Sequence, residues 1–316
     1  MRSPMRLARL SAALCTATLL ASGCTGGQQP GTSPTGSAPA TVQRYVAMGD
    51  SYSAGPLIPT TDLAGGCVRS DHDYPSLVAA RLHVAHLVDV TCSAATTREL
   101  THAQHPFAGS SIPPQLDAVT PRTDLVTLGI GGNDLSLFES LVRACSPVAA
   151  GRAAGAPCRG RLRSGGPDLR ARTATIGRRV TGALRAVRHR APRATVLLVG
   201  YLRLVPDRGT CPALALAPAD YAVGRRTTVA LNRALARAAA STGATFVDMY
   251  AASRGHDICS SDPWVNGRTT DRRKALAFHP FAAGMRADAD QVLAALAGSA
   301  SPGSASPGSA FGVPPR

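Results

Sequence analysis

The chain of 316 residues has very little lysine and few aromatic residues. Lys274 is its only lysine, and Phe, Trp and Tyr together make up 4% of it. A phosphate-binding loop of the Walker type needs a lysine directly behind its glycines, so this class is excluded. The scarcity of aromatic residues also disfavours a stacking surface for nucleic acid. We therefore interpret the net charge of +15, carried by dispersed arginines, as a solvated surface and expect no nucleic-acid partner.

Metal-ligand patterns are also missing. No C-x-x-C pair occurs, and although His83/His86 and His102/His105 have helical spacing, neither pair has a third ligand nearby. We expect no metal and no cofactor. The hydrophobic content of 44% still allows a full core, so the chain is predicted to be globular.

The N-terminal segment predicts export. Arg2, Arg6 and Arg9 precede the apolar run "LSAALCTATLLASG", which is too short to span a bilayer comfortably. Small residues before Cys24 resemble a lipobox, in which the cysteine is lipidated and becomes the new N-terminus; ordinary cleavage nearby is the alternative. We expect a signal peptide at 1–23, a flexible tether at 24–41 and a disordered tail at 299–316, both rich in Gly, Ser and Pro.

The cysteine count agrees with export. Cys15 leaves with the signal peptide and Cys24 is the lipidation candidate, which leaves an even number. Disulfides are expected in an exported chain, with zinc as the weaker alternative, and the sequence itself leaves the pairing open. The remaining cysteines are Cys67, Cys92, Cys145, Cys158, Cys211 and Cys259.

Residues 42–298 alternate strand and helix patterns. Apolar runs bounded by turn residues are typical of strands buried on both faces of a parallel sheet. Amphipathic stretches between them predict helices, so we expect a three-layer α/β/α domain with a five-stranded parallel sheet. Residues 140–170, rich in Gly, Arg and Pro, predict a surface excursion pinned by a disulfide. The predicted strands are 43–49, 85–92, 124–132, 194–201 and 244–250, and the helices are 74–82, 173–190, 227–242 and 279–297.

Polar residues follow three of the predicted strands, where the sites of such sheets form. Ser51 in "MGDSYSAG" opens a helix, whose backbone N–H groups favour negative charge; an ordinary helix-capping serine is the alternative. Ser93 and Ala94 leave the second strand, and Asn133 in "GIGGND" provides an amide. His279 lies near the end of the domain. A nucleophile, a base and oxyanion donors around one point are what acyl transfer requires.

The blocks "GDSYSAG", "GGND" and "FHP", in this order, resemble those of SGNH hydrolases of the GDSL esterase/lipase family. The resemblance covers about 42–297 and is greatest to secreted actinobacterial esterases and lipases. It implies that Ser51 is the nucleophile, His279 the base, and that Ser51 N–H, Ala94 N–H and the Asn133 amide hold the oxyanion. The family usually has glycine where Ala94 stands, and a positive φ there would be costly for alanine. The resemblance also implies sequential disulfides, Cys67–Cys92, Cys145–Cys158 and Cys211–Cys259.

His279 has no carboxylate within five residues before it or six after it. The family's usual D-x-x-H pattern has its aspartate where Leu276 stands, and some relatives orient the histidine through a main-chain carbonyl instead. A carbonyl on Nδ1 fixes the tautomer that directs Nε2 at the serine. We predict a Ser51–His279 dyad held by the Leu276 carbonyl, with Asp262 or Asp271 folding back as the alternative.

Other residues receive more ordinary interpretations. Asp50 is expected to support the nucleophile turn, and Tyr52 and Trp264 are candidates for lining an acyl pocket or for ordinary packing. The sequence as a whole predicts an exported, lipid-anchored, monomeric serine ester hydrolase acting on an ester or lipid substrate. A surface-tethered binding lipoprotein that kept the fold without catalysis is the alternative from another class.

Overall fold

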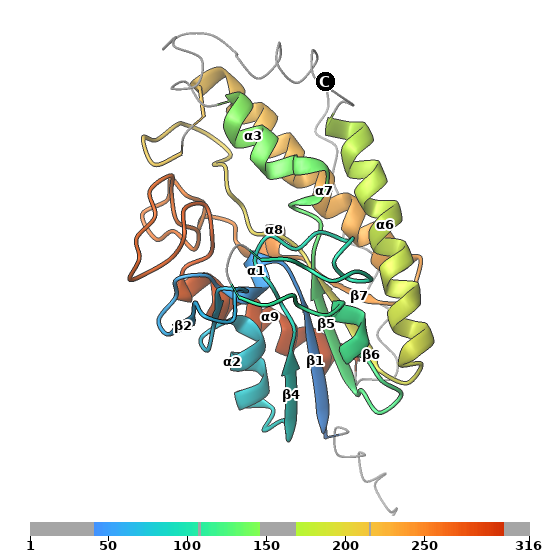
Figure 1. Ribbon diagram of the computed structural model, residues 1–316. Coiled ribbons are helices and arrows are strands. Elements are labelled where there is room, and N and C mark those ends of the chain that lie inside the picture. The colour runs from blue at the N-terminus through green and yellow to red at the C-terminus, as the bar shows by residue number, and fades with distance from the viewer. Residues whose placement is uncertain (1–40, 107–108, 146–168, 215, 300–316) are drawn as a thin grey trace, which may run out of the picture. The chain divides into compact units, whose positions relative to one another are not determined.

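A parallel sheet of five strands forms the centre of the computed structural model, which describes residues 41–106, 109–145, 169–214 and 216–299 (Figure 1). The strand order is β4-β1-β5-β6-β7, and every neighbouring pair runs parallel. The sequence-based prediction of five parallel strands is confirmed. The strands are β1 (Arg44–Gly49), β4 (His86–Asp89), β5 (Leu125–Gly129), β6 (Thr195–Val199) and β7 (Thr245–Val247).

Alternating residues of the strands build a separate core on each face of the sheet. Tyr45 and Ala47 of β1 pack into one cluster, whereas Val46 and Met48 pack into the other. All four are fully buried, as expected for strands covered on both sides. The predicted three-layer arrangement is therefore present.

The helices divide between these two faces. The cluster with Tyr45 includes residues of α2 (Tyr74–Arg81), α8 (Met249–Ala252) and α9 (Ala282–Ser299). The cluster with Val46 includes residues of α6 (Leu169–Arg190) and α7 (Tyr221–Ala240), which lie side by side in Figure 1. In α6, buried residues recur at helical spacing, including Ile176, Val180 and Leu184, because one stripe of the helix faces the sheet.

Shorter elements lie above the carboxyl ends of the strands or connect the layers. Helix α1 (Ser51–Ala54) follows β1 directly, and α3 (Leu137–Cys145) follows β5 after a 3₁₀ turn at Asp134–Ser136. Both therefore begin where the strands end, at the edge at which a functional site is expected. The remaining elements are a hairpin of β2 (Thr61–Asp62) and β3 (Arg69–Ser70), and 3₁₀ turns at Gln115–Ala118 and Pro218–Asp220.

Two of the predicted disulfides are present, Cys67–Cys92 and Cys211–Cys259. The third predicted pairing, Cys145–Cys158, involves a residue outside the described part of the chain, as do the predicted signal peptide, Cys24, the tether and nearly all of the predicted tail. The described residues all belong to one compact unit. Within the described ranges, no helix is both long and apolar enough to cross a membrane.

Candidate active site

The turn from β1 into α1 presents Ser51 at the edge of the sheet. Asp50 caps α1, and its carboxylate accepts a hydrogen bond from the Tyr52 N–H at 2.9 Å. Gly49 has a φ of +152°, and a Cβ there would lie 2.5 Å from the Gly129 carbonyl oxygen. Only glycine allows β1 and β5 to approach this closely at the turn. The tight turn leaves the Ser51 side chain at the start of α1.

Ser51 meets His279, which comes from the loop before α9. The Ser51 Oγ lies 2.8 Å from the His279 Nε2, although 228 residues separate the two in the chain. Ser51 is 7% exposed and the imidazole is half-buried. The Tyr52 ring packs against the imidazole with a centroid distance of 5.4 Å. The two residues predicted to form a dyad are thus in direct contact.

The Nδ1 atom of His279 bonds to a main-chain carbonyl, but that carbonyl belongs to Ala277, at 2.7 Å. The prediction that named Leu276 is wrong by one residue. The Leu276 carbonyl accepts from the His279 backbone N–H at 3.2 Å and from the Asn266 side-chain amide at 3.2 Å. This closes a turn in which Phe278 has a φ of +61°, so the imidazole folds back over Ala277.

Neither alternative aspartate bonds to His279. Asp262 contacts His256 instead, with 3.2 Å between its carboxylate and Nδ1. Asp271 lies 3.8 Å from the Lys274 ammonium and accepts the Arg273 N–H at 2.9 Å. In this arrangement His279 has a fixed tautomer and no carboxylate partner.

Burial determines the protonation of His279. It lowers the pKa of the imidazole to about 4, and the hydrogen bond to the Ala277 carbonyl offsets this only in part. The ring is therefore neutral at neutral pH, with Nδ1 donating to Ala277 and the lone pair of Nε2 directed at the Ser51 hydroxyl. This is the state in which an imidazole can accept a proton.

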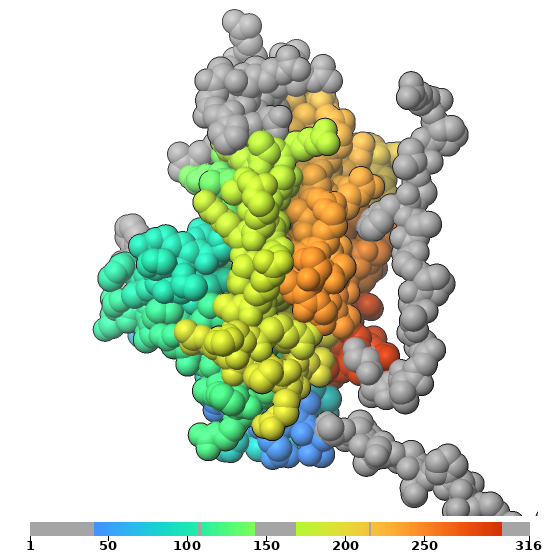
Figure 2. All heavy atoms as spheres, turned by 90° about the vertical axis from the view of Figure 1, so that its right-hand side faces the viewer, coloured from blue at the N-terminus to red at the C-terminus, as the bar shows by residue number. Residues whose placement is uncertain are grey.

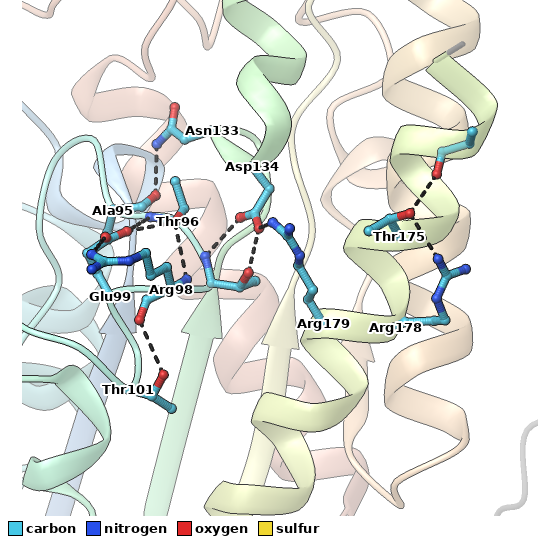
Figure 3. Close-up of polar contacts among 12 residues, drawn as sticks. Ala95, Thr96, Arg98, Glu99, Thr101, Asn133, Asp134, Thr175, Arg178 and Arg179 are labelled. Atoms are coloured by element: carbon cyan, nitrogen blue, oxygen red, sulfur yellow. Dashed lines mark hydrogen bonds and ion pairs between the residues drawn. The ribbon is translucent and has the colours of Figure 1, made fainter. Parts of the chain in front are cut away.

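Of the predicted oxyanion donors, Asn133 lines the same pocket as Ser51 and His279. The Asn133 amide donates one of its two N–H groups to the Ala95 carbonyl at 3.0 Å, which fixes the side chain (Figure 3). In the described part of the chain, the backbone N–H groups of Ser51 and Ala94 make no hydrogen bond. Ala94 has a φ of +67°, the left-handed conformation that normally favours glycine.

A buried carboxylate, that of Asp134, connects the two loops that carry Ala94 and Asn133. Asp134 is fully buried, accepts from the Thr97 backbone N–H at 2.8 Å and from its hydroxyl, and pairs with Arg179 of α6 at 3.0 Å (Figure 3). Loss of Arg179 would leave the Asp134 carboxylate buried without its ion-pair partner, and the Thr97 contacts hold the two loops together. Asp134 is the last residue of the "GGND" block, but its role as a connector was not predicted.

A second buried chain of hydrogen bonds connects the strand ends beneath Ser51. The Tyr201 hydroxyl donates to the Asp50 carboxylate at 2.5 Å and accepts from the Gly132 N–H at 2.7 Å. Burial raises the pKa of Asp50 to about 7, although the hydrogen bonds from Tyr201 and the Tyr52 N–H lower it. Asp50 supports the turn as expected. Tyr201 was missed, although its place at the end of the fourth predicted strand was a usable signal.

Asn266 was missed as well, and the sequence offers no signal for it. Its side-chain amide donates to the carbonyls of Ala275 and Leu276, at 2.9 and 3.2 Å, and its own N–H donates to the His279 carbonyl at 2.8 Å. One buried asparagine therefore holds the loop that carries the histidine.

A largely apolar pocket with an empty volume of about 840 Å³ opens beside Ser51 and His279. Tyr52 lines it, as one interpretation of the sequence suggested. Trp264 does not line it but stacks on His256 with a centroid distance of 4.0 Å. The described residues contain no group of three His, Cys, Asp or Glu side chains placed to hold a metal ion. The apolar lining is formed by Phe138, Leu141, Val142, Leu204, Val205, Leu214, Leu216 and Phe278.

The fold and this site are those of a carboxylic ester hydrolase, and the chain belongs to the GDSL-like lipase/acylhydrolase family, which it matches over residues 47–287. It is 39% identical over 263 residues to Lipase 2 of Streptomyces coelicolor, covering 79% of this chain and 84% of the relative. It is 31% identical over 241 residues to a lipase of Streptomyces rimosus, covering 76% and 81%.

Two solved structures share the fold closely. The crystal structure of phospholipase A1 from Streptomyces albidoflavus matches with a TM-score of 0.67 and 29% identity, over 80% of this chain and 99% of that one. The structure of the extracellular lipase from Streptomyces rimosus matches with a TM-score of 0.67 and 28% identity, over the same shares. These similarities agree with the family resemblance derived from the motifs.

Proposed function

We propose that the protein is an exported serine esterase that hydrolyses acyl esters of lipidic alcohols through a Ser51–His279 dyad. The observation that carries the proposal is the pair of contacts at His279, with Nε2 at 2.8 Å from the Ser51 hydroxyl and Nδ1 at 2.7 Å from the Ala277 carbonyl. The Ala277 carbonyl fixes the tautomer of His279, a role that the aspartate of a catalytic triad normally has.

The proposed reaction proceeds by acyl transfer. The Ser51 Oγ attacks the ester carbonyl carbon while His279 Nε2 takes the hydroxyl proton. The oxyanion that forms accepts from the Ser51 N–H, the Ala94 N–H and the second N–H of the Asn133 amide. Collapse of this intermediate expels the alcohol, which takes the proton from His279. Water then attacks the acyl-enzyme with His279 as base, releasing the acid.

The pocket supports an apolar acyl group as the substrate's acid part. It adjoins Ser51, and aliphatic and aromatic side chains of α3 and of 204–216 form most of its wall. Each methylene buried there stabilises the complex by about 0.8 kcal/mol, roughly a fourfold gain per carbon. The printed names of the relatives, which include a lipase and a phospholipase A1, agree with such substrates.

The proposed location is outside the cytoplasm. The disulfides Cys67–Cys92 and Cys211–Cys259 favour an oxidising compartment, and one structural relative is described as extracellular. We keep the sequence-based proposals of a signal peptide at 1–23, lipidation of Cys24, a tether at 24–41, a catalytic domain at 42–298, a tail at 299–316 and a monomeric enzyme.

Turnover of nitrophenyl esters of increasing chain length tests the proposal. We expect Ser51→Ala and His279→Ala to lose on the order of 10⁶-fold in kcat. Ser53→Ala is the matched control, because this serine lies in the same short helix but its hydroxyl contacts Tyr74 and Gly129. Wild type and Ser53→Ala should be labelled by a fluorophosphonate probe. Labelling that survives Ser51→Ala would refute the assignment of the nucleophile.

The acyl pocket has its own test. Val142 is half-buried in the pocket wall, and a larger side chain there fills the cavity without touching the dyad. Val142→Trp should reduce kcat/KM for long acyl chains by at least tenfold and leave acetate esters within about twofold. Equal losses for acetate and long-chain esters would show that the chain does not bind in this pocket.

A further inference from the structure

Two neighbouring helices of this protein contain no acidic residue. Helix α6 has seven arginines, α7 has four, and neither contains an Asp or Glu. Their buried stripes face the sheet, so the arginines gather on the outer side. Figure 2 views this side directly, with α6 in yellow-green and α7 in orange running next to each other across the surface. Arginines that are dispersed in the sequence thus converge in the fold.

The outer stripes of the two helices form what we call the basic face. All six of its members are exposed, and at 1.5 Å per residue each helix is roughly 30 Å long, so the charges extend along two neighbouring helices. Small residues such as Ala174 and Gly182 lie between the arginines. The basic face consists of Arg178, Arg185 and His189 on α6 and Arg226, Arg233 and Arg237 on α7.

In the part of the chain that the structure describes, the ion pairs of α6 lie beside the basic face. Arg179 pairs with Asp134 and Arg190 with Asp117, and neither arginine belongs to the outer stripe. On the other side of the sheet the charges are mixed, since Arg81 of α2 pairs with Asp290 of α9. Within the described ranges, the excess of positive charge is therefore carried by α6 and α7.

We propose that the basic face binds the surface of an anionic phospholipid bilayer. The choice of lipid rests on the proposed function, because such a bilayer also presents acyl esters. Basic residues near an anionic membrane each contribute about a fivefold gain in affinity. The only large hydrophobic side chain that is highly exposed in the described chain is Leu63, outside both helices, so the attraction is electrostatic and does not involve insertion.

Helix α6, which carries half of the basic face, also contacts a segment that lines the candidate active site. Arg172 of α6 donates to the Leu135 carbonyl at 3.2 Å and to the Ser140 hydroxyl at 2.8 Å, which ties α6 to the segment that carries α3. That helix provides Phe138, Leu141 and Val142 to the pocket. A bilayer held against α6 and α7 therefore lies next to the element that forms the pocket wall.

Vesicle binding by residues 39–316 tests the proposal. This segment includes every described residue of the compact unit and leaves out the apolar leader and Cys24, so that neither a hydrophobic leader nor a lipidated cysteine contributes to binding. Ser51→Ala is included throughout, so that no lipid is cleaved and failure of the proposed reaction cannot affect the result. We expect sedimentation with vesicles of phosphatidylglycerol and phosphatidylcholine, none with phosphatidylcholine alone, and release at about 1 M NaCl, where the screening length falls to about 3 Å.

Two triple variants with the same net charge locate the surface. Arg185→Gln with Arg226→Gln and Arg237→Gln should lower vesicle affinity on the order of 100-fold. The control changes Arg122, Arg254 and Arg286 to Gln, which are exposed residues outside the two helices, and should lower it less than tenfold. With Ser51 restored, both triples should hydrolyse a soluble nitrophenyl acetate at the wild-type rate, which shows that they fold. The single change Arg237→Glu tests the same surface with only one residue altered, and it should also lower vesicle affinity.

Three outcomes would overturn the proposal. Equal losses in the two triples would mean that total charge, not this face, determines binding. Unchanged vesicle binding by the first triple would mean that the face does not contact lipid. If the first triple lost retention on a soluble anionic polymer such as heparin while keeping vesicle affinity, the partner would be a polyanion and not a bilayer.

Discussion

Tyr52 follows the proposed nucleophile Ser51 in the chain and bonds to Phe278, the residue before the proposed base His279. Its hydroxyl donates to the Phe278 carbonyl at 2.6 Å, and its ring packs on His279 and on Tyr201. Because His279 has no carboxylate to orient it, these contacts and the Ala277 carbonyl determine where the imidazole points. At the scale of single residues, the site therefore depends on neutral hydrogen bonds.

Replacing Tyr52 by Phe tests this role. The loss of one hydrogen bond, about 1 kcal/mol, should lower kcat roughly fivefold while KM for a soluble ester stays within twofold. Tyr45→Phe is the matched control. It removes a buried hydroxyl of β1 that contacts the Thr127 hydroxyl of β5 at 2.7 Å. The control should lower the melting temperature but not kcat. If Tyr52→Phe changed only stability, the hydroxyl would have no positioning role.

The pH profile tests the environment of His279. Its pKa is lowered to about 4 by burial, so the imidazole stays neutral and able to accept a proton until the pH falls near that value. The acid limb of kcat/KM should therefore have its midpoint near pH 4, well below the value of about 6.5 for free imidazole. Asp271→Ala should leave the limb in place, because Asp271 contacts Lys274. A midpoint near neutrality, or a shift in the variant, would contradict the carbonyl arrangement.

At the scale of elements, the loop after β4 carries a strained residue into the site. Ala94 adopts a φ of +67° beside a disulfide, and the Ser93 N–H donates to the Cys67 carbonyl at 3.0 Å. The left-handed conformation costs a non-glycine residue about 1–2 kcal/mol. The disulfide, the Asn133–Ala95 contact and the Asp134–Thr97 contacts together hold the loop in place.

Substitutions at Ala94 should show this strain. Ala94→Gly should raise stability by up to about 1 kcal/mol and keep kcat within threefold, because the donor is a backbone N–H. Ala94→Val should lower both. Ala95→Gly is the control: Ala95 is buried without a positive φ, so the same exchange should destabilise it. Thermal melting and kcat measure the effects, and equal signs at the two positions would contradict the strain argument.

Removing the first disulfide tests the element as a whole. It closes a loop with a sequence separation of 25, so Cys67→Ala with Cys92→Ala should cost about 3.5 kcal/mol and lower kcat, because the loop beside Ala94 loosens. The Cys211–Cys259 bond has a separation of 48, and its removal should cost about 4 kcal/mol. Its loop includes Leu214 and Leu216 of the pocket, so long-chain KM should rise instead. The opposite pattern would refute these assignments.

At the scale of the whole molecule, the buried carboxyl group of Asp288 makes the stability of the fold depend on pH. Asp288 of α9 is 2% exposed, its Oδ1 has no hydrogen-bond partner in the described chain, and burial raises its pKa well above the ordinary value. A raised pKa means that the folded state holds a proton which the unfolded state releases above about pH 4. Stability is therefore lost as pH rises from there toward the folded pKa.

Asp288→Asn removes this penalty. The variant should match wild type near pH 4 and melt at a higher temperature at pH 8, because the amide has the same shape and never ionises. Asp290→Asn is the control, since Asp290 is exposed and paired with Arg81. Its melting temperature should change by little at either pH. A stabilisation of Asp288→Asn that is the same at pH 4 and pH 8 would contradict the titration.

The sequence determined a good part of the fold and of the candidate site. Strand patterns gave the five parallel strands because a run buried on both faces is almost continuously apolar. Ser51, Asn133 and His279 were found because each stands in a short block at a strand end or helix start. Two disulfide pairings followed from the family resemblance, and the third lies outside the described residues.

Only the tertiary structure decided what acts between distant segments. Whether Leu276 or Ala277 orients His279 depends on a turn and on Asn266, and no local pattern encodes either. Tyr201, Asp134 and Arg179 gained roles because strands and helices far apart in sequence end at the same place. The dispersed arginines became one face for the same reason, since α6 and α7 pack side by side with their apolar stripes turned inward. Motifs record local chemistry, whereas the packing of the chain decides which groups meet.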